Sequence, residues 1–590
     1  MSIIRFREAD CKNCYKCLRS CPVKAITFSA DQQAQINDKS CILCGNCLSV
    51  CPQNAKIVRN DVEKVRGWLG RKEKVYVSLA PSYVAAFGRV DLEGMTAALR
   101  QLGFVHVEET AVGAAEVSKE YVRLMQDKGM ANILSTACPT IVSLVEKHYP
   151  ELLGLLAPVV SPMVAHARML RATFGPRIRV VFIGPCLSKK EEASDVIHAG
   201  AVDAVLTFEE LEAWMQEERI EIDMLAGQVR QADATGAARL YPAPGGILKT
   251  LDRKDRKPYT CISIDGMDRC RTVLESLQSG LVDRHFIEMS ACAGSCLEGP
   301  CRKVLPGGYL VSRDRLVSSW RATASGCVKS GERPAVTEVV ATTARTIKKA
   351  PRIQLTRRFS DKRAEEAVPS EAVIRGILHS IGKYTPEKEL NCGACGYPTC
   401  REKAVAVFRN KAQLTMCLPY MQERAASMSN LILGTTPNAI LALDSDGNIQ
   451  EINRAARHLL AMEDKDVAGK PVFQYLDSPE LVLALDEGQN VIDQRVRYDR
   501  YGLTVEQTLV FVPDQRLAVL ILRNVTEEEA EREKRQQVRE ETVEIAQKVI
   551  EKQMRVAQEI ASLLGETTAE TKVALTRLKK SILLEGGGKP

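Results

Sequence analysis

Short apolar runs separated by longer amphipathic stretches characterise the middle of the chain. The clearest runs are residues 75–79, 131–135 and 178–183. Short buried strands that alternate with helices are typical of parallel α/β units, which gather ligands at the carboxyl ends of their strands. The pattern therefore predicts an α/β domain over residues 75–340. The charged stretch before it, residues 61–74, is predicted as a helical linker.

The last third of the chain has a different pattern. Residues 439–449 hold two apolar runs around an Asp-Gly turn, and residues 517–526 form an apolar run that enters a helix. These features predict strands joined by a tight turn, and together they resemble a PAS domain over residues 428–526. We expect His458 to be a plain helix residue, with a haem ligand as the alternative. Such a domain can serve as a relay or dimer surface without a ligand.

Residues 527–582 are rich in Glu, Lys, Arg and Gln, with apolar residues near a 3.5-residue spacing. The periodic residues are Val538, Ile545, Val549, Val556, Ile560 and Leu563. The pattern predicts a signalling helix or coiled coil, with a lone amphipathic helix packed on the PAS domain as the alternative. The tail at residues 586–588 is expected to be disordered, and the basic stretch at residues 340–385 to be a linker that leads into a helix.

Length and composition restrict the class of protein. A chain of 590 residues is too long for one core, so we expect a multidomain α+β protein. It has no apolar run of about 18 residues or more and no apolar signal core near its start, which predicts a cytoplasmic protein without a membrane span. The formal charge of +7 comes without a basic stripe interleaved with aromatic residues, so nucleic-acid binding is not expected.

Cysteine spacing carries the strongest chemical signal. Two copies of one motif, each followed by proline, lie within residues 1–60 and contain Cys11, Cys14, Cys17 and Cys21, then Cys41, Cys44, Cys47 and Cys51. This is the bacterial ferredoxin run, in which the fourth cysteine of each run ligates the other cluster. The prediction is two [4Fe-4S] clusters, in which Cys51 joins the first run and Cys21 joins the second. Paired zinc sites are the weaker alternative.

A third group of cysteines lies in a predicted domain at residues 375–425. Its members are Cys392, Cys395, Cys400 and Cys417. The group resembles the small four-cysteine [4Fe-4S] module of electron-transfer and hydrogenase-linked proteins, again with zinc as the alternative. Residues 403–416 are predicted as a helical stretch that returns Cys417 to the loop.

Four more cysteines belong to no local motif. They are Cys138, Cys186, Cys292 and Cys296. Scattered cysteines are more often inert buried thiols than metal ligands. However, the sequences around these four, together with residues 161–163 and 244–246, resemble the signature loops of [FeFe]-hydrogenases. The resemblance covers about residues 75 to 320.

This resemblance implies an H-cluster, a [4Fe-4S] cubane joined by one shared thiolate to a di-iron unit that carries CO and cyanide. By position, the four scattered cysteines would be its ligands, and Cys296 would supply the shared thiolate. Lys189 would hydrogen-bond a cyanide, with a solvated lysine as the alternative. Together with the three groups above, the chain would hold three accessory [4Fe-4S] clusters and one H-cluster.

Departures from the family pattern predict low turnover. Catalytic members carry a proton-passing cysteine where this chain has Ala137. Ser161 and Glu120 match the family's proton path, whereas Val117 stands in place of its second glutamate. Gly184 replaces a methionine that catalytic members usually carry. Because a positioned acid–base group is worth roughly a hundred- to ten-thousand-fold in rate, the pattern resembles the PAS-containing sensory branch of the family.

The remaining cysteines are expected to pack in the core. They are Cys261, Cys270, Cys301 and Cys327. A role for Cys301 in tuning or sensing the nearby cluster is the alternative, because it lies close to Cys296 in the sequence.

These observations predict a sensory hydrogenase. It would bind or slowly oxidise H2, pass electrons through its [4Fe-4S] clusters, and signal through the PAS domain to a separate kinase or phosphatase. Its other expected partners are a ferredoxin or another redox protein, and a second copy of the chain through the PAS domain or the C-terminal helix. The alternatives are a ferredoxin-linked catalytic hydrogenase and a non-hydrogenase iron–sulfur scaffold.

Overall fold

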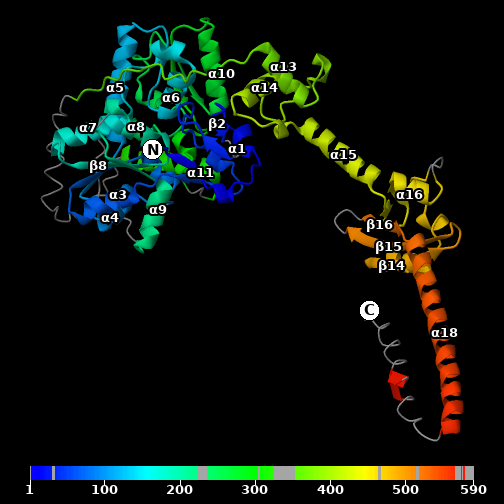
Figure 1. Cartoon of the computed structure of the whole chain (residues 1–590). Coiled ribbons are helices and arrows are strands. Elements are labelled where there is room, and N and C mark those ends of the chain that lie inside the picture. Colours follow the sequence, from blue (N-terminus) through cyan, green and yellow to red (C-terminus); the bar gives the residue numbers. More distant parts are fainter. Residues whose placement is uncertain are drawn as a thin grey trace. The chain divides into compact units, whose positions relative to one another are not determined.

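The computed structural model describes residues 2–29, 33–88, 90–198, 200–222, 236–302, 306–324, 353–462, 467–512, 517–564, 573–574 and 576–577. The chain divides into two compact units, Met1–Tyr420 and Met421–Pro590, and each is described by itself (Figure 1). Cys327, residues 586–588 and most of the expected helix beyond Leu564 lie outside the described residues. Within the described ranges, no helix is long and apolar enough to cross a membrane.

The first unit begins with a small domain made of two similar halves. Its strands form two antiparallel pairs, β1 (Ile4–Phe6) with β4 (Lys56–Val58) and β2 (Ile26–Phe28) with β3 (Ala34–Ile36). The two short helices, α1 (Lys16–Arg19) and α2 (Asn46–Ser49), each carry the third cysteine of a run. The repeated motif thus gives a repeated structure, as the ferredoxin pattern predicts.

Two parallel sheets form the core of the next domain, with strand orders β6-β5-β8-β9 and β10-β11-β7. The first contains β5 (Val75–Leu79), β6 (His106–Glu109), β8 (Arg179–Gly184) and β9 (Ala204–Thr207). The second contains β7 (Ile133–Leu134), β10 (Thr260–Asp265) and β11 (His285–Ser290). Every residue of β5 is buried, which is typical of a parallel strand covered on both faces. The predicted parallel α/β architecture is confirmed.

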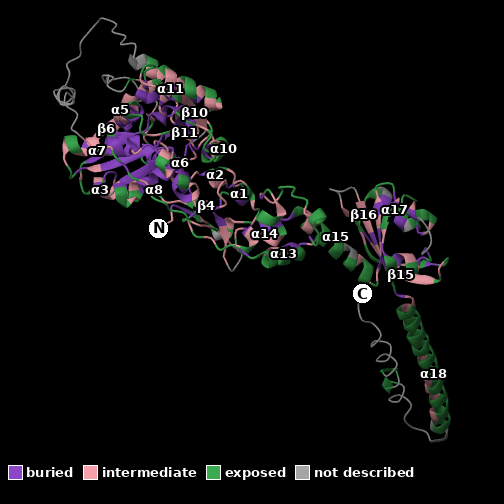
Figure 2. Ribbon diagram, turned by 90° about the horizontal axis from the view of Figure 1, so that it is seen from above, coloured by how far each residue is buried: buried purple, intermediate pink, exposed green. Residues whose placement is uncertain are grey.

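Helices cover these sheets, and buried residues concentrate on the strands between them (Figure 2). They are α4 (Leu92–Gln101), α5 (Ala111–Asp127), α6 (Pro139–His148), α7 (Pro162–Phe174), α8 (Ser188–Ser194), α9 (Phe208–Glu217), α10 (Met267–Gln278) and α11 (Gly308–Ala324). Before them comes α3 (Val62–Gly70), where a helical linker is expected. The helix is present, but it is not a mere linker, because Val65 and Trp68 are buried in the same core as the first sheet.

Residues 353–363 run across this domain, and we call them the strap. The Val160 amide donates to the Leu355 carbonyl at 2.8 Å, and the Lys362 amide donates to the Glu146 carbonyl at 2.8 Å. The strap is therefore part of the packed domain, and the prediction of a linker over residues 340–385 is wrong for this part of the chain. Backbone hydrogen bonds hold the strap against the domain, and only the residues after it lead into a helix as expected.

A small module completes the first unit. It contains α13 (Glu371–Ser380), α14 (Cys400–Phe408) and a turn of 3₁₀ helix, η10 (Leu414–Met416). The predicted continuous helix over residues 403–416 is wrong, because Asn410 adopts a left-handed conformation with φ 54° just past α14. The module lies beside α1 in both views (Figures 1 and 2).

Helix α15 (Leu418–Thr435) leads into the second unit, whose sheet is antiparallel with strand order β13-β12-β16-β15-β14. Its strands and helices are β12 (Ala439–Asp444), β13 (Ile449–Ile452), α16 (Arg454–Leu459), α17 (Pro479–Glu487), β14 (Val491–Tyr498), β15 (Leu503–Val512) and β16 (Leu517–Asn524). The predicted pair of strands around the Asp-Gly turn is present. His458 is an exposed residue of α16, as expected of a plain helix residue.

The long helix α18 (Thr526–Leu564) ends the described fold. It meets the PAS-like sheet near its start, where Glu529 pairs with Arg495 of β14 at 3.0 Å. Farther along, the periodic residues Val538 and Ile545 are 55% and 62% exposed, and Figure 2 shows most of the helix as exposed. The alternative in which this apolar stripe packs on the PAS domain is therefore wrong.

Candidate metal centres

Three strand ends bring the scattered cysteines together. Cys138 follows β7 and precedes α6, Cys186 follows the end of β8, and Cys292 follows the end of β11. Cys296 lies in a single turn of 3₁₀ helix, η8 (Ser295–Glu298). We call these four residues the dispersed set. The carboxyl ends of parallel strands are the expected place for a ligand site.

The thiols of the dispersed set lie close enough to act on one another's protonation. Burial and then the neighbouring Cys138 raise the pKa of Cys186 to about 11. Burial, with Cys186 and Cys138, raises the pKa of Cys296 to about 12. By accessible surface Cys296 is nevertheless exposed, so it is not part of the packed core. A thiolate-binding metal group would have to displace these protons when it binds.

Lys189 is the cation of this site. Its ammonium group donates to Glu192 at 2.7 Å and to the Ala137 carbonyl at 3.5 Å, and the residue is only 8% exposed. Its positive charge lowers the pKa of Cys186 and Cys296 against the larger effect of burial. The alternative of a solvated lysine is therefore wrong.

Glu192 is held in turn by the strap. Its second carboxylate oxygen lies 3.5 Å from the guanidinium group of Arg357, which is 6% exposed. Despite burial, Lys189 and Arg357 hold the pKa of Glu192 below its usual value. Two buried cations thus share one buried carboxylate beside the dispersed set. The charged sequence of the strap gives no signal that Arg357, rather than its exposed neighbour Arg358, would be buried.

A second buried carboxylate, Glu288 of β11, holds the turn at residues 245–248. Glu288 is 2% exposed, and it accepts a hydrogen bond from the Leu248 amide at 3.1 Å. Burial raises its pKa to about 7. The turn that it holds includes Gly246, where an added Cβ would lie 1.9 Å from the Leu240 carbonyl oxygen. A lone acid within an apolar strand was the signal that could have identified Glu288 from the sequence.

The ferredoxin-type domain brings its cysteines together across the two runs. One pocket is lined by Cys11, Cys14, Cys17 and Cys51, which we call the first set. The second set is Cys41, Cys44, Cys47 and Cys21. Burial raises the pKa of Cys47, with smaller contributions from Cys44, Cys41 and Cys21. Both groups have the crossed membership that the motif predicts.

The local set, Cys392, Cys395, Cys400 and Cys417, lines another pocket. Lys403 also lines it, and the Lys403 ammonium group is buried and donates to the Leu414 carbonyl at 3.0 Å. The three 4-cysteine groups and the dispersed set thus each offer four thiols to one place, which fits the donor chemistry of iron–sulfur clusters. In the described part of the chain, no three Cys, His, Asp or Glu side chains converge tightly enough to hold a single metal ion.

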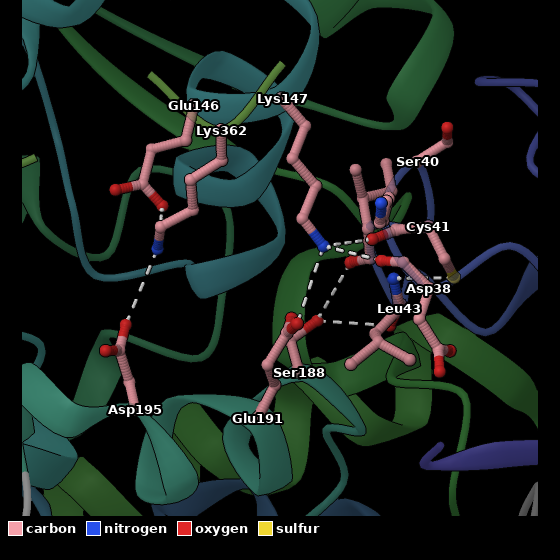
Figure 3. A network of polar contacts seen from close by, with 12 residues as sticks. Asp38, Ser40, Cys41, Leu43, Glu146, Lys147, Ser188, Glu191, Asp195 and Lys362 are labelled. Carbon is pink, nitrogen blue, oxygen red and sulfur yellow. Dashed lines mark hydrogen bonds and ion pairs between the residues drawn. The ribbon is translucent and has the colours of Figure 1, made fainter. Parts of the chain in front are cut away.

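Figure 3 shows how the second ferredoxin run docks on α6 and α8. Lys147 of α6 donates to the carbonyl groups of Cys41 at 2.6 Å and Asp38 at 3.2 Å. Ser188 of α8 donates to the Leu43 carbonyl at 3.1 Å. Ser188 lies two residues after Cys186, and Cys44 and Cys138 pack against the same apolar cluster, so the second set lies beside the dispersed set.

Comparison with known proteins agrees with this arrangement. Residues 73–300 match the family described as the iron-only hydrogenase large subunit, C-terminal domain. Residues 10–55 match the 4Fe-4S dicluster domain, residues 389–419 a putative Fe-S cluster family, and residues 428–542 the PAS fold. The chain therefore combines a domain similar to the iron-only hydrogenase large subunit with two iron–sulfur domains and a PAS domain.

Its similarity to individual proteins is distant. It is 26% identical to iron hydrogenase 1 of Clostridium pasteurianum over 50% of this chain and 63% of that protein, so it spans less than two thirds of its relative. It is 30% identical to the cytosolic Fe-S cluster assembly factor NAR1 of Vanderwaltozyma polyspora over 30% of this chain and 36% of that protein. A solved [FeFe]-hydrogenase of Chlamydomonas reinhardtii covers 52% of this chain and 100% of its own, with 16% identity and a TM-score of 0.38.

The residues that match the proton path differ in how deeply they are buried in the hydrogenase-like domain. Ser161 is fully buried at the start of α7, and its hydroxyl has no hydrogen-bond partner among the described residues. Glu120 lies near the surface on α5, where it accepts a hydrogen bond from Arg123 at 2.9 Å. Val117, one turn earlier on α5, is fully buried. The buried position, Val117, thus carries an apolar side chain, and the position near the surface, Glu120, carries an acid.

At Gly184 of the hydrogenase-like domain, the ring of Phe182 occupies the space that a side chain would need. An added Cβ would lie 2.7 Å from the ring of Phe182, two residues earlier on β8. Residues two apart on a strand point to the same face, so Phe182 covers this position. A methionine at this position would therefore require the Phe182 ring to move.

Two of the described cysteines that belong to none of the four sets, Cys270 and Cys301, are buried in the protein core. Cys301 is 2% exposed in an apolar cluster with Leu187 and Leu43, and burial raises its pKa. Cys270 is fully buried, and its thiol donates to the Ser290 carbonyl at 3.4 Å. Cys261 is partly buried. These placements favour core packing for Cys270 and Cys301.

Proposed function

We propose that the chain is a hydrogen sensor in which the dispersed set holds an H-cluster that turns over slowly. One observation carries the proposal: the dispersed set is assembled beside a buried Lys189, yet the residue before Cys138 is Ala137. The binding residues of the centre are therefore present, whereas the side chain that would exchange protons beside it is absent.

The chain's own residues have distinct roles in this proposal. The four cysteines would hold the H-cluster, with Cys296 as the shared ligand, and this group would supply an iron position at which hydrogen binds. Lys189, fixed by Glu192, directs its ammonium group toward the loop of Ala137. Ser161 offers a buried hydroxyl, but the methyl group of Ala137 cannot pass a proton toward it. Slow proton exchange follows, because positioned acid–base groups supply roughly 10²- to 10⁴-fold in rate.

The other cysteine sets would hold three accessory [4Fe-4S] clusters. The first, second and local sets each present four thiols, and the second set lies beside the dispersed set through the contacts of Lys147 and Ser188. Electrons would pass along these sets to a ferredoxin or another redox partner. The PAS domain and α18 would report the redox state to a separate kinase or phosphatase. The exposed apolar stripe of α18 would pair with a second copy of the chain.

Ala137→Cys tests the proposal directly. Restoring a proton-passing thiol should raise hydrogen turnover of the matured protein by about 10²- to 10⁴-fold. Ala137→Ser is the matched control, because its hydroxyl has similar size but holds its proton far more tightly. Infrared bands of iron-bound CO and cyanide, recorded under argon and then under hydrogen, should shift in the native protein. Native turnover already equal to that of Ala137→Cys would favour a catalytic hydrogenase instead.

An iron–sulfur assembly scaffold is the second candidate. The similarity of 190 residues to an Fe-S cluster assembly factor favours it. In that case the dispersed set would hold a simple cluster, and no CO or cyanide bands would appear in protein with full iron content. The buried Lys189 and its charge partners favour the sensor, because a simple cubane needs no such cation beside its thiolates.

A further inference from the structure

The local module docks on the ferredoxin-type domain through a continuous surface. The Phe28 amide donates to the Asn410 carbonyl at 2.8 Å, and the Tyr15 hydroxyl group bonds to the Gln413 side chain. Leu18 of the ferredoxin-type domain and Met416 of the module belong to one apolar cluster. The module is therefore packed against this domain rather than tethered beside it.

One end of the second set lies at this surface. Gly396, with φ +87°, approaches α1 so closely that an added Cβ would lie 2.8 Å from the Arg19 Cα. The next residue, Tyr397, is 6% exposed, and the Lys24 ammonium group lies 5.4 Å from the centre of its ring. Arg19 and Lys24 flank Cys21 in the sequence, so the module meets the chain at this cysteine.

Tyr397 packs in one apolar cluster with cysteines of different sets. Burial raises the pKa of its hydroxyl group, and the thiols of Cys395 and Cys21 add to the rise. Cys395 and Cys21 also pack in the same apolar cluster. Toward the dispersed set, Cys44 and Cys138 pack against the same apolar cluster.

We propose that the module is a side branch that exchanges electrons directly with the second set, which becomes a three-way junction. The first set, the dispersed set and the local set would each communicate through Cys21, Cys41, Cys44 and Cys47. In each transfer one electron leaves the reduced cluster of one set, which is oxidised, and reduces the cluster of the neighbouring set. No bond forms or breaks. The proposal rests on the cluster assignments of the proposed function, but not on hydrogen sensing.

Electron paramagnetic resonance of the reduced, full-length protein tests the junction. Neighbouring reduced clusters broaden or split each other's signals, and iron content shows which clusters are present. In Cys14→Ala, which removes a ligand of the first set, the interaction of the local cluster should persist. In Cys47→Ala, which removes a ligand of the second set, it should disappear. The opposite result, or persistence in both variants, would overturn the branch.

Two glycines of one loop supply a matched pair in case the cysteine variants fail to fold. Gly393 and Gly396 both have positive φ, but an added Cβ at Gly393 meets nothing within 4 Å, whereas at Gly396 it meets Arg19. Gly396→Ala should weaken the interaction while the module keeps its iron, and Gly393→Ala should retain it. Equal spectra for the two variants would contradict the proposal.

The results of these paramagnetic resonance experiments do not depend on whether the chain is a hydrogen sensor. Reconstitution with iron and sulfide is enough for the three accessory clusters, so the spectra need neither the di-iron unit nor hydrogen. A protein without CO and cyanide bands could still show the branch. Conversely, a responsive hydrogen sensor could show a local cluster that interacts with the first set alone.

Discussion

The dispersed and local sets of the first unit reach the same four-thiol chemistry by opposite routes. The dispersed set comes from three strand-end loops that span residues 138–296. The local set comes from one loop, the start of α14 and the residue after η10, all within residues 392–417. Burial raises the pKa of Cys186 and Cys296 in the dispersed set. Each set nevertheless has one exposed cysteine, Cys296 in the dispersed set and Cys392 in the local set.

The difference shows what each site depends on. A site drawn from several strand ends is positioned by contacts that lie outside its own loops, here those of Glu192, Glu288 and Lys147. A site within one short segment is positioned mainly by that segment and its own turns. Substitutions at remote contacts should therefore alter the dispersed set and leave the local set unchanged. Three predictions test this contrast, from the largest expected effect to the smallest.

Glu192→Gln should have the largest effect. It keeps the shape of the side chain but leaves Lys189 and Arg357 as buried cations without their shared carboxylate. Breaking a buried ion pair on one side costs about 3–5 kcal/mol. The melting temperature of the cluster-loaded protein should fall, while the paramagnetic signal of the local cluster stays unchanged.

The neighbouring acid provides the control. Glu191 is 42% exposed and pairs with Lys147 at 3.4 Å, so Glu191→Gln should cost less than about 1 kcal/mol. Equal melting temperatures for the two variants would mean that the Glu192 network does not hold the site.

Glu288→Gln should change the pH dependence of stability. The pKa of Glu288 is about 7 in the folded chain and near its usual value of 4.5 when unfolded, so the folded state holds a proton that the unfolded state has lost. Native stability should therefore fall as pH rises from about 4.5 to 7, by at most on the order of 3 kcal/mol. The variant does not lose stability in this way. Its melting temperature should therefore be higher than that of the native protein at pH 8, and the difference should be smaller at pH 6. A pH-independent difference would show that Glu288 does not titrate there.

Lys147→Met should have a smaller and more local effect. It keeps the apolar stem but removes the donor that serves the carbonyl groups of Cys41 and Asp38 (Figure 3). Unsatisfied buried acceptors cost about 1–3 kcal/mol. Amide hydrogen exchange at residues 38–44 should speed up, and exchange within the local module should not. Lys119→Met is the control, because Lys119 is 70% exposed; the same change in both variants would contradict the docking role.

Sequence alone predicted the sites that spacing encodes. The two ferredoxin runs and the local set follow from short intervals between cysteines in one stretch of sequence, and the structure gathers each group in one place. The parallel strands followed from apolar runs such as residues 75–79. The ligand roles of all these cysteines, the domain boundaries and the cytoplasmic location stay predictions.

What sequence could not predict arises from contacts between distant segments. Nothing in the local pattern distinguishes buried Arg357 from exposed Arg358, because only contacts with distant residues such as Glu192 decide which of them is buried. The charged stretch at residues 61–74 suggested a linker, although Val65 and Trp68 on one of its faces are buried. The helix predicted through residue 416 ended early because Asn410 adopts a left-handed conformation.

The strap also limits how far the local module can travel. Its end at residue 363 is separated from the start of α13 at residue 371 by a short stretch of chain, which spans at most about 30 Å when fully extended. If the module dissociated from the ferredoxin-type domain, the connecting chain would keep it within about 30 Å of the end of the strap. Its effective concentration at the docking surface would then be in the millimolar range. Release would therefore be brief and recapture independent of protein concentration, so dilution could not separate the module from its docking surface.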